Sequence, residues 1–172
     1  MIENRKAYRV PFRTKFVYAT EEKVITGNTV NLSAGGIFIS ALELLPRETQ
    51  CKVLFQLSPD EAPISISAII KRVSQSTTDP EHIPGLGFQF VGAGHEEVKQ
   101  RIDIFMEETR KNFEVAATIL SSGEPDLSSL SEFLSRMHLP SFQDLGELRM
   151  YVERVLRAIE LVESNTKDEL SR

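Results

Sequence analysis

Two short motifs in the first part of the chain combine side chains that can bind phosphates and aromatic bases. Arg5 and Arg9 form R-x-x-x-R. Asn31, Ser33 and Gly36 form N-x-S-x-x-G. Guanidinium groups bind phosphate oxygens through paired hydrogen bonds and stack on aromatic rings. Asparagine and serine supply short donors and acceptors, and a glycine lets a ligand or another backbone approach closely. Together the motifs suit a ligand with two negative charges and two purine rings.

Each motif also has a purely structural interpretation. Asn31 and Gly36 could only shape a turn, and Arg5 and Arg9 could be solvated surface residues. Either motif alone has little specificity. The two in order, 22 residues apart from Arg9 to Asn31, are far more specific when they fall on a regular pattern of strands.

The elements that must position the motifs are short β-strands between Arg9 and Val91. Runs rich in β-branched and aromatic residues are separated by polar, glycine or proline turns. These runs predict strands at residues 10–18, 24–30, 37–39, 52–57, 64–70 and 86–91. Gly27 and Asn28 indicate a bend or bulge in the second strand. Six strands without intervening helices predict a small antiparallel barrel or sandwich.

After Gly94 the apolar residues recur every three or four positions, which is one face of a helix. This spacing predicts a long helix that ends at residues 121–125 and a shorter helix from Leu127 to Met137. A capping box at Ser141–Asp144 would begin a third helix. We therefore expect two parts, residues 1–120 with the barrel and its helix, and residues 121–172 with a helical extension.

The third helix carries apolar residues at the spacing of a coiled-coil seam, namely Leu145, Leu148, Val152, Val155, Ile159 and Val162. The seam is short for a stable coiled coil on its own. Either the helices pack on the barrel or on each other, or they mediate self-association or docking of a protein partner through residues 127–164.

The charge distribution bounds the class of ligand. The chain has a net charge of −5, whereas its first 20 residues hold five basic residues and one acidic residue. A small basic segment on an acidic protein suits a compact anion and argues against nucleic acid, which needs a broad basic face.

No apolar run reaches the roughly 18 to 20 residues that span a bilayer, and no signal peptide is evident. With Cys51 as the only cysteine, a cytoplasmic location is expected.

The two motifs together resemble the signature of the PilZ domain family. The similarity continues through Gly85-Leu86-Gly87-Phe88-Gln89-Phe90, which is similar to the glycine-rich closing strand of that domain, and into the helix after Gly94. The adjacent Gly35 and Gly36 resemble a delta-proteobacterial style of the motif. The resemblance implies a mainly β fold, with a six-stranded antiparallel barrel, a long helix and here a helical extension.

The resemblance also implies a bacterial receptor for cyclic di-GMP, often bound as a stacked dimer, that regulates processes such as motility or biofilm formation. Arg5 and Arg9 would contact phosphates and guanine faces, and Asn31 and Ser33 would contact a guanine or a phosphate. Gly36 would leave room, and Lys6 and Gly35 are further candidate contacts. The alternative is an adaptor with the same fold that binds no ligand and acts through its C-terminal helices.

The other residues that could take part in catalysis or metal binding are interpreted as structural. No metal site, cofactor or catalytic constellation is expected, because the histidines are scattered and Ser33 lies in no nucleophile motif. Cys51 is expected to be a buried structural thiol. Lys71 and Arg72 could lie near the ligand, but they are interpreted as a solvated strand end. The strand phenylalanines are expected in the core, at positions Phe38, Phe55, Phe88 and Phe90.

Overall fold

The computed structural model describes residues 7–75, 83–122 and 142–170, with side chains up to 164, and single positions between 125 and 139. The chain divides into two compact units. One unit is Pro11–Phe105, and the other combines the chain before Pro11 with the chain from Met106 onward. The sequence-based division at residues 120 and 121 stays a prediction.

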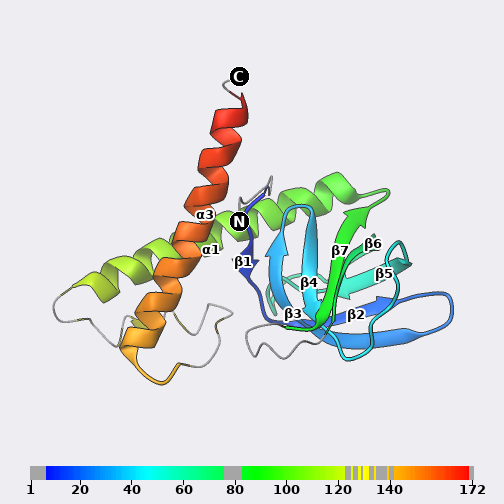
Figure 1. The fold of residues 1–172 in the computed structure, drawn as a ribbon, viewed down its shortest axis with the longest axis horizontal. Helices are drawn as coiled ribbons and strands as arrows, with labels where there is room; N and C mark the ends of the chain where they lie inside the picture. The colour runs from blue at the N-terminus through cyan, green and yellow to red at the C-terminus, as the bar shows by residue number, and fades with distance from the viewer. Residues whose placement is uncertain are drawn as a thin grey trace. The chain divides into compact units, whose positions relative to one another are not determined.

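Six antiparallel strands close into a barrel in the first unit (Figure 1). The strands are β2 (Lys15–Ala19), β3 (Val24–Ser33), β4 (Gly36–Ser40), β5 (Gln50–Phe55), β6 (Ile64–Ser74) and β7 (Gly85–Val91). They pair in the order β3-β2-β5-β6-β7-β4, and the pairing of β3 with β4 closes the ring. A two-residue strand, β1 (Val10–Pro11), adds to β3. The predicted six-stranded antiparallel barrel is confirmed.

Aromatic side chains fill the barrel because alternate residues of each strand face inward. Phe16 contacts Tyr18, Phe55 and Phe88, with ring centroids 5.3–6.1 Å apart. At the start of the unit, Phe12 packs edge-on against Phe105 at 5.3 Å. These rings bury large apolar areas and fix the barrel's interior.

The first predicted strand is interrupted in the structure. Residues 10–18 form β1 and β2 with a break at Phe12–Thr14. At the break, the Thr14 N–H donates to the Thr29 hydroxyl at 2.7 Å, and the Thr29 N–H donates to the Thr14 carbonyl at 3.1 Å. A buried threonine on β3 therefore holds the break, which partial alternation in the sequence could not reveal.

Two strands contain an extra residue relative to their partners. The register shifts between Thr29 and Asn31 in β3, so Val30 is a bulge. It also shifts between Ile70 and Arg72 in β6, so Lys71 is a second bulge. The irregularity expected at Gly27 and Asn28 is thus observed nearby in the same strand, at Val30. A bulge re-aims the side chains that follow it.

Two long helices follow the barrel, α1 (His95–Ser121) and α3 (Leu145–Leu170). The turn before α1 contains Gly92 and Gly94 at φ of 90° and 82°, a conformation that favours glycine. In the second unit, α3 crosses the later turns of α1 (Figure 1). None of the described helices is long and apolar enough to cross a bilayer.

The predicted seam of α3 is used inside the helical unit. Leu148 and Val152 join Phe113, Ala116 and Leu120 of α1 in one buried cluster. Ile159 and Val162 are also buried, whereas Leu145 is exposed. Packing of the helices on each other is therefore the observed arrangement.

The predicted capping box is displaced by three residues. Asp144 is the N-cap of α3, because its carboxylate accepts from the Glu147 N–H at 2.8 Å, and Glu147 in turn accepts from the Gln143 N–H at 2.8 Å. The box was therefore wrongly placed at Ser141–Asp144, and Ser141 lies outside the described residues. Leu127 and Met137, the ends of the predicted second helix, also lie outside them.

Candidate functional site

The N-x-S-x-x-G motif forms the hairpin between β3 and β4. Ser33 pairs with Gly36 across a two-residue turn, Ala34 and Gly35. The Ser33 hydroxyl donates to the Gly36 carbonyl at 3.1 Å. The Gly35 carbonyl accepts from the Phe90 N–H at 3.0 Å, which ties the turn to β7. The hairpin is thus held in place by hydrogen bonds within the chain, and the Ser33 oxygen can still accept a hydrogen bond.

Gly36 permits a close approach between strands. A Cβ atom on Gly36 would lie 2.1 Å from the Phe88 carbonyl oxygen, and one on Gly85 would lie 1.9 Å from the Ile39 carbonyl oxygen. Both approaches join β4 to β7, which are neighbouring strands of the barrel. Gly35, by contrast, has open space around its Cβ position. The motif's glycine could leave room for a ligand or for another backbone, and the structure shows the approach of another backbone.

A row of outward-facing residues runs from the motif across four strands. Asn31 pairs with Phe38, Phe38 with Gly87, and Gly87 with Arg72. The Arg72 guanidinium lies over the Phe38 ring, 5.8 Å from its centroid. Because Gly87 has no side chain, Arg72 and Phe38 can meet across it. We call Asn31, Phe38, Gly87 and Arg72 the motif row.

The bulge at Lys71 gives Arg72 its orientation. Ile64, Ile66, Ala68 and Ile70 alternate inward and are buried. Strict alternation would place residue 72 inside as well, but the extra residue turns Arg72 to the outer face, where it is exposed. Lys71 and Arg72 are exposed as expected, but the strand end was wrongly placed, because β6 continues to Ser74.

Phe38 also differs from its predicted place in the core. Phe55, Phe88 and Phe90 are buried as expected, whereas Phe38 is half-buried on the outer face. The apolar run Ile37-Phe38-Ile39 does not reveal which member faces out. The sequence did indicate a cation near the motif, because Arg72 is a basic residue that follows an alternating strand. Its contact with the Phe38 ring depends on the strand register, which the sequence does not reveal.

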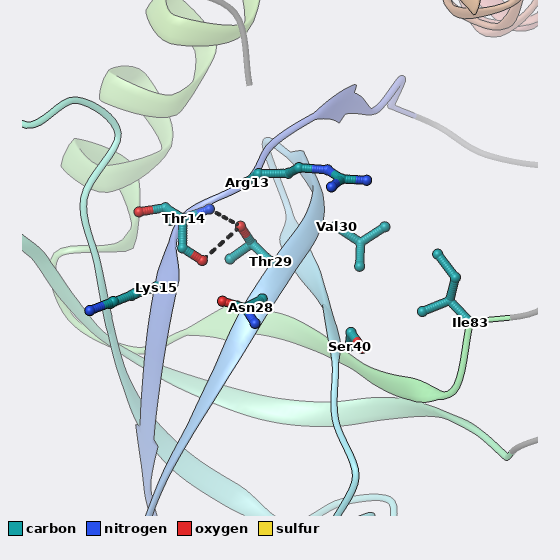
Figure 2. Close-up of a pocket in the computed structure, with 8 residues that line it drawn as sticks. All are labelled: Arg13, Thr14, Lys15, Asn28, Thr29, Val30, Ser40 and Ile83. Carbon is teal, nitrogen blue, oxygen red and sulfur yellow. Dashed lines mark hydrogen bonds between the residues drawn. The ribbon is translucent and has the colours of Figure 1, made fainter. Parts of the chain in front are cut away.

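A pocket of about 500 Å³ lies on the barrel near the motif row. Asn28, Thr29 and Val30 of β3 line it together with Ser40, the last residue of β4. Arg13 and Lys15 contribute cationic side chains, and Ile83 adds an apolar wall (Figure 2). Its volume is in the range of small-molecule sites, roughly 300–1,000 Å³.

The structure brings Asn31, Ser33 and Gly36 together on one hairpin. Arg9 is half-buried just before β1 and belongs to the other compact unit. Arg5 and Lys6 lie outside the described residues.

Two titratable groups lie inside the barrel. Cys51 is buried, and burial raises the pKa of its thiol. Burial, followed by the negative charges of Glu43 and Cys51, raises the pKa of Tyr18. The thiol is therefore less reactive than an exposed one, as a structural role requires. In the described part of the chain, no cluster of His, Cys, Asp or Glu residues is arranged to hold a metal ion.

Comparison with known proteins gives the class of this chain. The model of the PilZ domain matches residues 3–122, more than half of the sequence. The chain therefore belongs to the PilZ domain family. No curated protein matches the sequence.

Several solved structures are similar in part. The inhibitor of motility MotI/DgrA from Bacillus subtilis is 20% identical with a TM-score of 0.46, and the match covers 62% of this chain and 53% of that one. The PilZ domain of CeSA from a cellulose-synthesizing bacterium is 20% identical with a TM-score of 0.46, covering 58% and 98%. YcgR from Escherichia coli, in complex with c-di-GMP, is 19% identical with a TM-score of 0.49, covering 67% and 50%. The chain thus spans about half the length of MotI/DgrA and of YcgR.

Proposed function

We propose that this protein is a bacterial receptor that binds cyclic di-GMP and passes the signal to a protein partner. The observation that carries the proposal is a PilZ domain whose N-x-S-x-x-G hairpin is intact and lies beside an outward-facing cation. Asn31 is half-buried on the same row as Phe38 and Arg72. An amide, an aromatic edge and a guanidinium on one face suit a purine ring and a phosphate.

The proposed roles follow from the chemistry of each group. Arg5 and Arg9 bind phosphates and guanine faces, with Lys6 as a further cation. Asn31 and the Ser33 oxygen hydrogen-bond a guanine edge or a phosphate. Gly35 has open space around it, so a ligand can approach its backbone. We also propose that the adjacent glycines are the delta-proteobacterial form of the motif. The ligand is proposed to bind as a stacked dimer.

Isothermal titration with cyclic di-GMP tests the proposal. We expect saturable heat with the intact chain, and much weaker binding for Asn31→Ala and for the Arg5→Ala/Arg9→Ala double variant. Arg47→Ala is the matched control, because Arg47 is exposed and lies in neither motif. An intact chain that releases no heat at high micromolar ligand would refute receptor function.

The receptor is proposed to have no catalytic activity and to work in the cytoplasm. Incubation of the purified protein with cyclic di-GMP, followed by chromatography of the nucleotide, tests the first point. Recovery of unchanged ligand is expected, and any turnover that survives repurification would contradict it.

A second candidate is a PilZ-fold adaptor that binds no ligand and acts through its C-terminal helices, residues 127–164, as a homo-oligomer or by docking a partner. Met150 and Leu161 of α3 favour this function, since 67% and 58% of their surfaces are exposed. Light scattering on a Met150→Glu/Leu161→Glu variant tests it. The adaptor predicts loss of association in this variant and normal behaviour of the arginine variant.

A further inference from the structure

The sequence continues the arginine spacing one step further than the R-x-x-x-R motif. Arg13 follows Arg9 by four residues. Unlike Arg9, it belongs to the barrel unit, where it lies between β1 and β2 and is exposed. The barrel thus carries an arginine of its own on the chain segment that enters it.

Arg13 lines the pocket of about 500 Å³ beside β3. In Figure 2 its side chain extends over Val30, and Lys15 points the other way beyond Asn28. All the lining residues are neutral or basic, and the described lining contains no carboxylate. Hydroxyls of Thr14 and Ser40 add polar groups. Such a lining favours an anion.

The pocket also has an apolar side. Val30 and Ile83 contribute branched aliphatic groups, and Ile83 is 44% exposed. Aliphatic groups next to a cation can contact the face of a ring while the cation binds an attached phosphate. The combination fits a phosphate ester of an aromatic base better than a bare inorganic anion.

The pocket and the motif row use neighbouring residues of the same two strands. Ser40 of the pocket and Phe38 of the row are two residues apart on β4, so they share a face and lie about 7 Å apart. On β3, the bulge residue Val30 directly precedes Asn31. One ligand of dinucleotide size can therefore reach both.

We propose that the Arg13 pocket is a further subsite of the cyclic di-GMP site, which takes a phosphate on Arg13 and a base against Val30 and Ile83. This inference rests on the proposed receptor function. Its consequence is that the barrel binds part of the ligand without Arg5 and Arg9.

Titration of two pocket variants with cyclic di-GMP tests the subsite. Arg13→Glu reverses the charge, and Ile83→Glu adds a negative charge to the apolar wall; each is expected to raise Kd about tenfold or more through repulsion of the phosphate. The controls make the same changes elsewhere. Arg47→Glu reverses an exposed arginine, and Leu54→Glu replaces an apolar residue that is 43% exposed on β5. Thermal unfolding establishes that all four variants fold.

The outcomes separate the two proposals. If the intact chain binds and the pocket variants bind as tightly as their controls, the subsite is refuted and the receptor stands. If the intact chain does not bind, the receptor function fails and the subsite fails with it. If Arg13→Glu does not fold, Ile83→Glu alone decides, by the same comparison with Leu54→Glu.

Discussion

At the scale of single residues, the motif's glycine has a structural role that can be separated from ligand binding. Gly36 and Gly35 are neighbours, yet the first faces the Phe88 carbonyl and the second faces open space. A methyl group is therefore a different perturbation at each position. This contrast gives a matched pair of variants within one motif.

We expect Gly36→Ala to destabilise the barrel by about 1–3 kcal/mol or more, because a Cβ cannot fit beside a backbone oxygen without moving a strand. Gly35→Ala is expected to stay within about 1 kcal/mol of the original protein. Urea unfolding measures both. Equal stabilities for the two variants would mean that β4 and β7 can separate without cost, contrary to the close approach described.

Tyr18 predicts a pH dependence of stability. Its side chain is fully buried, and its hydroxyl has no hydrogen-bond partner among the described residues. Because burial raises its pKa, the folded state keeps the proton at a pH where the unfolded chain loses it. Stability is then fully present below the ordinary value of 10.0 and declines above it. Cys51 acts in the same direction from 9.0 upward.

Tyr18→Phe is therefore expected to match or exceed the original stability at neutral pH, since an unsatisfied buried hydroxyl costs about 1–3 kcal/mol. It should also lose less stability in alkali. Unfolding free energies measured from neutral pH to above pH 10.0 check both points. Parallel pH profiles for the two proteins would mean that burial does not raise the pKa of Tyr18.

At the scale of elements, α3 separates a buried side from an exposed one. Leu148 is 3% exposed and contacts the α1 cluster, whereas Leu161 is 58% exposed on the same helix. Arg110 of α1 also lies within 3.8 Å of Glu163 of α3. Much of the apolar seam read from the sequence is thus buried, whereas Leu161 is among the described apolar residues of α3 that stay exposed.

Leu148→Ala is expected to lower the stability of the helical unit by about 2–5 kcal/mol, because it leaves a cavity between two helices. Leu161→Ala makes the same chemical change at an exposed position and should cost about 0.5 kcal/mol or less. Far-ultraviolet circular dichroism during thermal unfolding compares them. A larger loss for Leu161 would indicate that its side of α3 is covered in solution.

The sequence predicted element types better than their details. Alternation and three-four spacing gave the six strands and both long helices, because burial of one face leaves a periodic pattern. The break at Thr14 and the bulges at Val30 and Lys71 leave no such pattern, since they depend on pairing with distant strands. For the same reason the motif residues could be named from the sequence, whereas the contact of Arg72 with Phe38 could not.

At the scale of the whole molecule, α1 serves both compact units. Its first turns bury Ile102 in the barrel unit, and its later turns bury Phe113, Ala116 and Leu120 against the C-terminal helices. Truncation after the first predicted part would therefore uncover an apolar face.

A chain that ends at residue 120 is expected to self-associate for this reason, and light scattering would show a mass above that of one chain. Adding Phe113→Lys to the truncated chain should reduce the association. A monodisperse truncated chain would mean that α1 hides this face by other means. Point variants on the exposed side of α3 are consequently the cleaner test of the adaptor function.

The motif row depends on which residues pair across its four strands, and the two bulge residues stand outside that pairing. Deletion of Lys71 would restore regular pairing in β6 and leave Arg72 opposite Gly87 on the outer face, because the residues on either side of the bulge already face consecutive residues of β7. Deletion of Val30 would likewise leave Asn31 on the outer face. A deletion at either bulge is therefore a one-residue loss that keeps every member of the motif row in its place and removes only the local bend of the strand.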